Sequence, residues 1–270
     1  MNLGIYIWDV SHGLAVTIVT PYKRVLAYNA GRSATFSPLQ MLSGIGVIWL
    51  DCFVLSHPHP DHLRDIDALI ALRPLLLWRR KLPKERIREG AEPGREESVV
   101  DRYQRELDHV YTQPATPSPT DYGWGGCEFR AFSPPEHPNL NNTSIVLFAG
   151  YGGGYVCMPG DLEKDGWTAL IARADFRAYL AQTTVLMTPH HGRETGVCQE
   201  AFALMKPQLC VTSEGPYSPT SPAVYSALAT EASVRRRSTG LIVPRRALST
   251  RKDGHVAINF SAGSWTASIA

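Results

Sequence analysis

The sequence predicts an α/β fold, an αββα sandwich in which two mixed β-sheets pack face to face between outer helices. Both halves of the 270-residue chain contain strand-like segments, and the second half alternates them with helical ones. The run 47–56, VIWLDCFVLS, is apolar and β-branched, as expected of a buried strand. A polar, histidine-rich run follows at its end, which indicates a functional site at one sheet edge.

The elements of the first half follow from residue patterns. Apolar and β-branched segments separated by turn residues predict strands at 3–10, 14–20, 25–28 and 47–56. Apolar residues at helical spacing predict helices at 34–46 and 63–74. A charge-dense insertion at about 79–120 is expected to form surface helices over 79–110 and then a loop.

The second half continues the alternation. Strands are expected at 127–133, 144–149, 154–158, 183–188, 208–213, 239–243 and 255–260. Helices are expected at 165–181, 197–205 and 221–232. We expect residues 1–270 to form one domain, since layered folds of this length often do.

Composition excludes several classes of protein. The chain is 44% hydrophobic, which supplies a core, and its net charge of +2 does not by itself indicate a nucleic-acid or membrane partner. No apolar run is long enough to span a bilayer, and the N-terminus lacks the features of a signal peptide. Five scattered cysteines without a CxxC pair predict free thiols and a cytoplasmic location.

The strongest signal is the run Ser56-His57-Pro58-His59-Pro60-Asp61-His62. On an extended backbone, His57 and His59 point to the same side and can share one ion. Asp61 and His62 follow in a turn, where they can face a neighbouring ion. Imidazole nitrogen with carboxylate oxygen suits zinc, manganese or iron. The motif is far more specific than a lone His-x-His, and a polar surface turn is the weaker alternative.

These residues resemble the hallmark motif of the metallo-β-lactamase superfamily, and further segments are similar to the metallo-β-lactamase domain of ComEC-type competence proteins. The similar segments are IWDVSHGLA at 7–15, LSHPHPDH at 55–62, NNTSIVL at 141–147, PGD at 159–161, HHG at 190–192 and STRKDGHV at 249–256. They cover nearly the whole chain in the family's order. The two histidine motifs are specific, and the terminal segments are weak individually.

The resemblance implies a site that holds two divalent metal ions, Zn or Mn. It assigns His57 and His59 to the first ion, Asp61 and His62 to the second, Asp161 to a bridge between them, and His190 to the second site. His191 is then a nearby substrate contact or proton donor, although the choice between His190 and His191 as ligand stays open. The implied chemistry is hydrolysis by a metal-activated water, with Asp61 and His191 in catalytic roles.

The chain departs from the family pattern at several positions. Asn29 stands where an aspartate usually helps to orient the metal cluster, which weakens that support. Asn141 lies where many superfamily members have a third metal-binding histidine, and Ser144 belongs to the same segment. His137 is close enough in sequence to substitute as a ligand, but we do not expect it to. A histidine usual in the family is missing around 216–219.

Basic residues cluster near the C-terminus. Arg235, Arg236 and Arg237 are followed by Arg245-Arg246 and Arg251-Lys252, with no acidic residue between Arg235 and Lys252. Such a face attracts a phosphate backbone, and we expect Arg235 and Arg236 to contact substrate. An ordinary solvated surface is the alternative.

The resemblance therefore predicts a metal-dependent hydrolase, and most specifically a phosphodiesterase or nuclease with a nucleic-acid substrate and no membrane partner. One alternative is hydrolysis of a small molecule such as a cyclic nucleotide, thioester or lactone. Another is a non-catalytic, metal-binding module that serves as a partner in a larger protein assembly.

Overall fold

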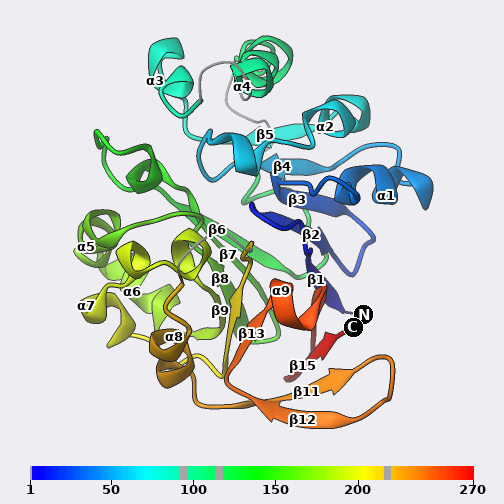
Figure 1. Cartoon of the computed structure of the whole chain (residues 1–270), viewed down its shortest axis with the longest axis vertical. Coiled ribbons are helices and arrows are strands. Elements are labelled where there is room, and N and C mark those ends of the chain that lie inside the picture. The colour runs from blue at the N-terminus through cyan, green and yellow to red at the C-terminus, as the bar shows by residue number, and fades with distance from the viewer. Residues whose placement is uncertain (1, 92–96, 113–117, 216–219) are drawn as a thin grey trace.

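The computed structural model describes residues 2–91, 97–112, 118–215 and 220–270, and these residues form the predicted αββα sandwich (Figure 1). Two mixed β-sheets face each other and helices cover their outer faces. The expectations for residues 113–117 and 216–219 lie outside the described residues. Among the described residues, no helix is long and apolar enough to cross a membrane.

The larger sheet, nine-stranded within the described residues, combines both ends of the chain. Its order is β12-β11-β15-β14-β1-β2-β3-β4-β5. The strands are β1 (Leu3–Ile7), β2 (Ala15–Val19), β3 (Val25–Ala30), β4 (Cys52–Val54), β5 (Leu76–Trp78), β11 (Ala232–Arg236), β12 (Ile242–Arg245), β14 (Val256–Ser261) and β15 (Ser264–Ile269). The pairs β3–β4, β4–β5 and β11–β15 are parallel and the others are antiparallel.

The smaller sheet contains six of the described strands in the order β13-β10-β9-β8-β7-β6. They are β6 (Glu128–Phe132), β7 (Val146–Tyr151), β8 (Gly154–Met158), β9 (Thr183–Met187), β10 (Leu209–Thr212) and β13 (Ala247–Ser249). The strands β8, β9, β10 and β13 run parallel, so their carboxyl ends lie at one edge of the sheet. Residues that follow these strands are thereby brought together.

Helices lie outside both sheets (Figure 1). Beside the larger sheet are α1 (Pro38–Gly44), α2 (Ile66–Leu72), α3 (Lys84–Arg88) and α4 (Glu97–Tyr103). Beside the smaller sheet are α5 (Lys164–Ile171), α6 (Ala174–Leu180), α7 (Gln199–Phe202) and α8 (Pro222–Leu228). The short α9 (Thr250–Asp253) directly follows β13.

Several element predictions need correction. The helix expected at 165–181 is interrupted at Arg173, whose extended backbone separates α5 from α6. The helix expected at 221–232 ends at Leu228, and the strand β11 begins four residues later. Strands β5, β13 and β15 were not expected. Each is short or polar on one face, so pairing with a neighbour decides its conformation more than its own residues do.

The core consists of apolar layers between and outside the sheets. Between the sheets, β1 contributes the fully buried Leu3 and Ile5 and the facing strand β8 contributes Val156. Outside the larger sheet, α2 and α4 pack on β4 through residues such as Leu69 and Phe53. Burial of such side chains contributes about 1.5–3 kcal/mol each. This packing fixes the strand ends that carry the polar site.

The charged insertion adds the expected surface helices α3 and α4 to this frame. Asp108 anchors it, because its carboxylate lies 2.6 Å from both Arg79 Nε and Lys81 Nζ. After α3, Gly90 passes close to the candidate site, where an added Cβ would lie 2.5 Å from His59 Cδ2. The insertion therefore forms part of the wall around His59.

Candidate metal centre

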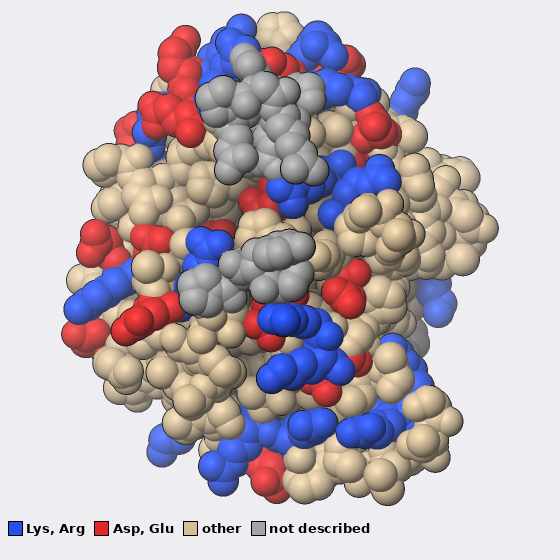
Figure 2. All heavy atoms as spheres, viewed as in Figure 1, with Lys and Arg blue, Asp and Glu red and all other residues tan. Residues whose placement is uncertain are grey.

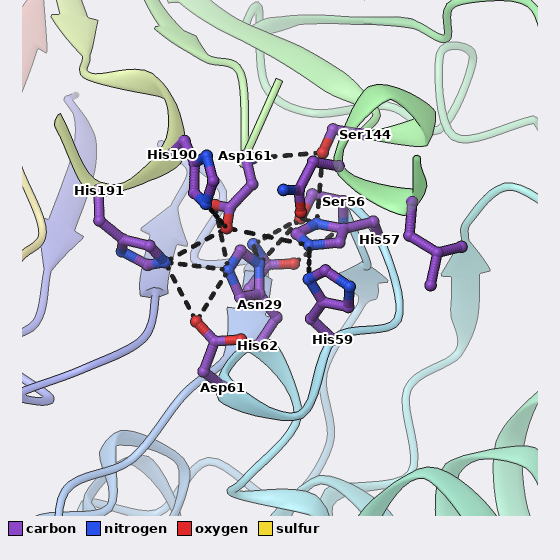
Figure 3. A network of polar contacts seen from close by, with 12 residues as sticks. Asn29, Ser56, His57, His59, Asp61, His62, Ser144, Asp161, His190 and His191 are labelled. Carbon is purple, nitrogen blue, oxygen red and sulfur yellow. Dashed lines mark hydrogen bonds and ion pairs between the residues drawn. The ribbon is translucent and has the colours of Figure 1, made fainter. Parts of the chain in front are cut away.

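The histidine and aspartate motifs lie where strands of both sheets end (Figure 3). The HPHPDH run follows β4 of the larger sheet and includes a 3-10 turn at Pro60–His62. Asp161 follows β8 of the smaller sheet, and His190 and His191 follow β9 in a turn at Pro189–Gly192. The site is therefore built from both sheets at one edge of the sandwich.

Glycine at position 160 allows the close approach of these loops. Gly160 has φ +59°, a conformation that other residues rarely adopt, and an added Cβ would lie 2.7 Å from Ser56 Cβ. The absence of a side chain at Gly160 therefore lets Asp161 lie close to the loop that carries His57 and His62.

The structure brings the predicted ligands into two groups, and Asp161 belongs to both. Asp61, His62, Asp161 and His191 form one group, and His57, His59 and Asp161 form the other, with the potential ligand atoms of each group within 4.8 Å of one another. Such an arrangement suits a carboxylate shared between two ions.

Individual distances support this grouping. Asp161 lies 3.2 Å from His62 through Oδ1 and 3.9 Å from His57 through Oδ2. His57 Nε2 lies 2.9 Å from His59 Nδ1, and His191 Nε2 lies 3.1 Å from Asp61 Oδ2. Six nitrogen- or oxygen-bearing side chains thus face one another in a small volume.

His191, and not His190, occupies the remaining place in the group around Asp61. His190 Nε2 is 3.8 Å from Asp161, while its Nδ1 lies 2.8 Å from Thr195 Oγ1 and 3.0 Å from Glu163 Oε1. The geometry does not support the expectation that His190 completes the second site. Both histidines have positive φ, so this tight turn sends their adjacent side chains in different directions.

Charge is concentrated in a buried environment. Burial alone would raise the pKa of Asp161, but His191 and His62 beside it hold that pKa well below its usual range. Burial likewise opposes the ionised form of Asp61, but His62 and His191 lower its pKa. The two carboxylates raise the pKa of His191 well above normal despite its burial. Buried carboxylates of this kind require positive charge nearby.

Burial decides the pKa of the two histidines in the other group. It lowers the pKa of His57 well below normal, and it also lowers the pKa of His59. Neutral imidazoles are the form that binds metal. His57 and His59 are therefore prepared to donate nitrogen lone pairs.

Asp161 provides a direct test of whether the residues fit a metal. Its Oδ1 is buried and lies 3.2 Å from His62 Nε2, yet it makes no hydrogen bond of acceptable geometry among the described residues. A buried carboxylate oxygen without a hydrogen bond is costly unless another group satisfies it. Nitrogen and oxygen donors around such an oxygen fit zinc or manganese.

Hydrogen bonds orient the histidines from behind. His191 Nδ1 lies 2.9 Å from the Ser213 carbonyl oxygen, which directs its Nε2 toward the carboxylates. Ser56 Oγ lies 3.1 Å from Nδ1 of both His57 and His62. Ser144 Oγ lies 3.3 Å from His57 Nδ1 and accepts a 3.2 Å hydrogen bond from the Asp161 amide.

Asn29 occupies the centre of this supporting layer. It is almost fully buried and its φ of 59° is one that asparagine tolerates. Its Oδ1 accepts a 2.9 Å hydrogen bond from the Ser56 amide, which fixes the orientation of the side chain. Its Nδ2 therefore points at Ser56 Oγ and at His62 Nδ1, each 2.9 Å away. Asn29 thus contacts a predicted ligand, as expected.

His137 lies outside both metal-binding groups of the described residues. Asn141 Nδ2 donates a 3.2 Å hydrogen bond to Glu163, and its buried Oδ1 has no partner among the described residues. His137 Nε2 lies 3.5 Å from Asp165 Oδ2.

Some polar neighbours of the site were not anticipated from sequence. Glu163 contacts His190, and its position two residues after Asp161 is the only sequence signal that it carries. His12 Nε2 lies 3.7 Å from Asp61 Oδ2. The loop between β1 and β2 therefore also borders the site.

The basic segment is divided between two faces. On β11, Val234 and Arg236 share the inner face of the larger sheet, while Arg235 points to the opposite face because side chains alternate along a strand. Arg236 lines a cavity beside the metal centre and Arg235 does not. The expectation that both arginines contact substrate is thus supported by position only for Arg236.

Comparisons with known proteins identify relatives of this chain. No protein-family model matches the chain. The chain is 26% identical over 230 residues to Recombination protein 2 of Haemophilus influenzae, covering 82% of this chain and 25% of that protein. It is 23% identical over 187 residues to ComE operon protein 3 of Bacillus subtilis, covering 66% and 21%. The chain therefore spans about a quarter of the length of these relatives.

A solved metallohydrolase structure has the same fold as this chain. Igni18, a metallo hydrolase from Ignicoccus hospitalis, matches with a TM-score of 0.51 and 14% identity over 89% of this chain and 98% of that one. A metallo-β-lactamase from Cronobacter sakazakii matches at 17% identity and a TM-score of 0.42, covering 70% and 77%. The chain has the metallo-β-lactamase fold. Within that fold it resembles ComEC-type proteins, as its motifs predicted.

Proposed function

We propose that this protein is a metal-dependent phosphodiesterase that acts on a polynucleotide. The observation that carries the proposal is the sharing of Asp161 between two buried groups of ligands. A shared carboxylate holds two ions close together, and paired ions suit in-line displacement at phosphorus because they stabilise both the attacking and the leaving oxygen.

The residues assigned to the centre differ from the sequence-based set at one position. His57, His59 and Asp161 would hold one ion, and Asp61, His62, Asp161 and His191 would hold the other. Zinc or manganese fits these donors. Bound ions would supply Lewis acidity, which activates water and neutralises charge that develops during attack on phosphorus.

The protein's own groups prepare this site in three ways. The Ser213 carbonyl fixes the direction of the His191 ring. The side chain of Asp61 is 13% exposed, against 4% for Asp161, so Asp61 is the carboxylate placed to orient a water that enters from solvent. Burial of the histidines excludes bulk water from the ligand nitrogens, which strengthens every electrostatic interaction there.

A polynucleotide is favoured over a small diester by the charge beside the centre. Figure 2 shows lysine and arginine side chains gathered on this face over β11, β12 and α9. Cationic residues at this position attract the phosphates that flank a scissile bond. A small diester has no flanking phosphates that such a surface could bind.

The proposal is tested with purified protein loaded with Mn²⁺ or Zn²⁺. Elemental analysis is expected to give two ions per chain. The loaded protein should cleave single-stranded DNA, double-stranded DNA or RNA and should be inactive after chelation. His59→Ala, which removes one predicted ligand, is the matched inactive variant. Two bound ions without cleavage of any polynucleotide or of bis(p-nitrophenyl) phosphate would refute the proposed reaction, and hydrolysis of the small diester alone would refute the polynucleotide.

A further inference from the structure

A basic cavity of about 560 Å³ lies next to the metal centre and plays no part in holding the ions. It opens between the inner face of β11 and β12 and the elements β13 and α9. Ligand sites commonly have volumes of about 300–1,000 Å³, so this cavity has room for a nucleotide-sized group. Its cationic lining consists of Arg236, Arg245, Arg251 and Lys252.

The cavity shares a wall with the metal centre. Gly192, which directly follows His191, lines it together with Thr212 and Glu214. The residue between the last two, Ser213, provides the carbonyl that orients His191. Residues that line the cavity are thus direct sequence neighbours of residues that belong to or orient the metal centre.

Two acidic side chains also line the cavity, against four cationic ones. Glu214 accepts a hydrogen bond from the Ser249 hydroxyl. Asp253 accepts a 3.0 Å hydrogen bond from the Ser249 amide and lies 3.5 Å from Arg245.

The remaining cations are available for an anion. Arg236, Arg251 and Lys252 are exposed and form no ion pair with the residues that the structure describes. Exposed cations without acidic partners, in a cavity of this size, produce a positive potential that favours a phosphate group. Arginine is suited to this role because its planar fork matches phosphate oxygens.

We infer that this cavity is a phosphate-binding subsite, which holds a second phosphate of the substrate while the scissile phosphate lies at the metal centre. The inference rests on the proposed function and adds to it a basis for substrate preference. A substrate with several linked phosphates engages both positions, whereas a diester with one phosphate engages only the metal centre. The protein should thus prefer polynucleotides through Arg236, Arg245, Arg251 and Lys252.

The alternating faces of the strands supply matched controls for an experiment. Arg236 and Arg245 line the cavity, while their neighbours Arg235 and Arg246 do not. Removing either kind of arginine changes the net charge by the same amount. Variants of the two kinds therefore separate a built subsite from a general positive field.

The test compares kcat/KM for a short single-stranded DNA with kcat/KM for bis(p-nitrophenyl) phosphate. Arg236→Ala and Arg251→Ala should each lower the ratio of DNA to small diester by about tenfold, through a higher KM for DNA. Each should also reduce the dependence of DNA cleavage on salt by about one phosphate contact. Arg235→Ala and Arg246→Ala should leave the ratio within about twofold of wild type.

Each outcome has one meaning. An equal fall of the DNA-to-diester ratio in all four variants would show that a general positive field attracts the DNA. An unchanged ratio in every variant would show that DNA does not reach the cavity. Both results overturn the subsite, while cleavage of DNA by the wild type preserves the proposed function. If the wild type hydrolyses neither compound, the proposed function fails. Binding of the same DNA, measured by fluorescence anisotropy, then decides the subsite: weaker binding confined to Arg236→Ala and Arg251→Ala supports it, and equal binding overturns it.

Discussion

Replacing Asn29 by aspartate should strengthen metal binding at the site that contains His62. The amide of Ser56 must donate to Asn29 Oδ1, so the Asn29 Nδ2 group faces His62 Nδ1 at 2.9 Å. His62 directs Nε2 toward Asp161, and an imidazole that binds metal through Nε2 carries its proton on Nδ1. Two N–H donors then face each other across 2.9 Å. The native amide therefore opposes the tautomer that metal binding requires.

Aspartate removes this conflict and fits the same space, because its side chain has nearly the same size and shape as that of asparagine. Its second oxygen would accept the Nδ1 proton of His62, and its first would still accept the Ser56 amide. A hydrogen bond to a charged group contributes about 1.5–3 kcal/mol, and 1.4 kcal/mol corresponds to a tenfold change in affinity. The unloaded protein also gains part of this interaction, so Asn29→Asp should tighten binding of the ion at the site that contains His62 by about tenfold, toward the lower end of that range.

Competition with a chelator of known affinity measures the effect, and thermal unfolding confirms that the variant is folded. Asn142→Asp is the matched control, because this buried amide accepts hydrogen bonds from the amides of Glu163 and Gly166 and contacts no candidate ligand. It adds the same charge away from His62. Unchanged or weaker binding in folded Asn29→Asp would refute the reasoning. An equal gain in both variants would show that charge, and not the tautomer, is responsible.

Three further changes test the ligand set and the packing beneath it. His191→Ala should lose one bound ion by elemental analysis while His190→Ala keeps both; the reverse would restore the original assignment. Asp161→Ala should be stripped of metal by a chelator at lower concentration than Asn141→Ala, and equal sensitivity would show that the carboxylate is not shared. Tyr28→Phe should lower the free energy of unfolding by about 1–2 kcal/mol in urea, because the hydroxyl lies 2.9 Å from two backbone carbonyls of the facing sheet; an unchanged midpoint would contradict this.

The sequence predicted the layers and the ligand-bearing loops because both depend on local patterns. The apolar run 47–56 contains the buried strand β4, although only Cys52–Val54 forms the strand and Ile48 and Trp49 are exposed. The motif at 57–62 carries its candidate ligands within six residues. Strands β5 and β15 could not be predicted in this way. Pairing with strands that are distant in the sequence stabilises them, and Ala267 on β15, for example, pairs with Val234 on β11.

The choice between His190 and His191 also exceeded what sequence can decide. Adjacent residues in a tight turn point in directions that depend on φ and ψ, and both histidines adopt positive φ. The partners that settle the choice, Ser213 for one and Glu163 for the other, come from elsewhere in the chain. The same limit applies to Arg235 and Arg236. Their side chains lie on opposite faces of β11, and the packing of that strand decides which face lines the cavity.

The placement of Asp161 and His57 on loops from opposite sheets has a mechanical consequence. Ions held between these loops would cross-link the two sheets at one edge of the sandwich, in addition to the apolar layer that packs between them. Because a ligand that binds only the folded state stabilises it in proportion to the logarithm of its concentration, metal supply would set the resistance of that edge to opening. Catalytic competence and mechanical cohesion would then rise and fall together.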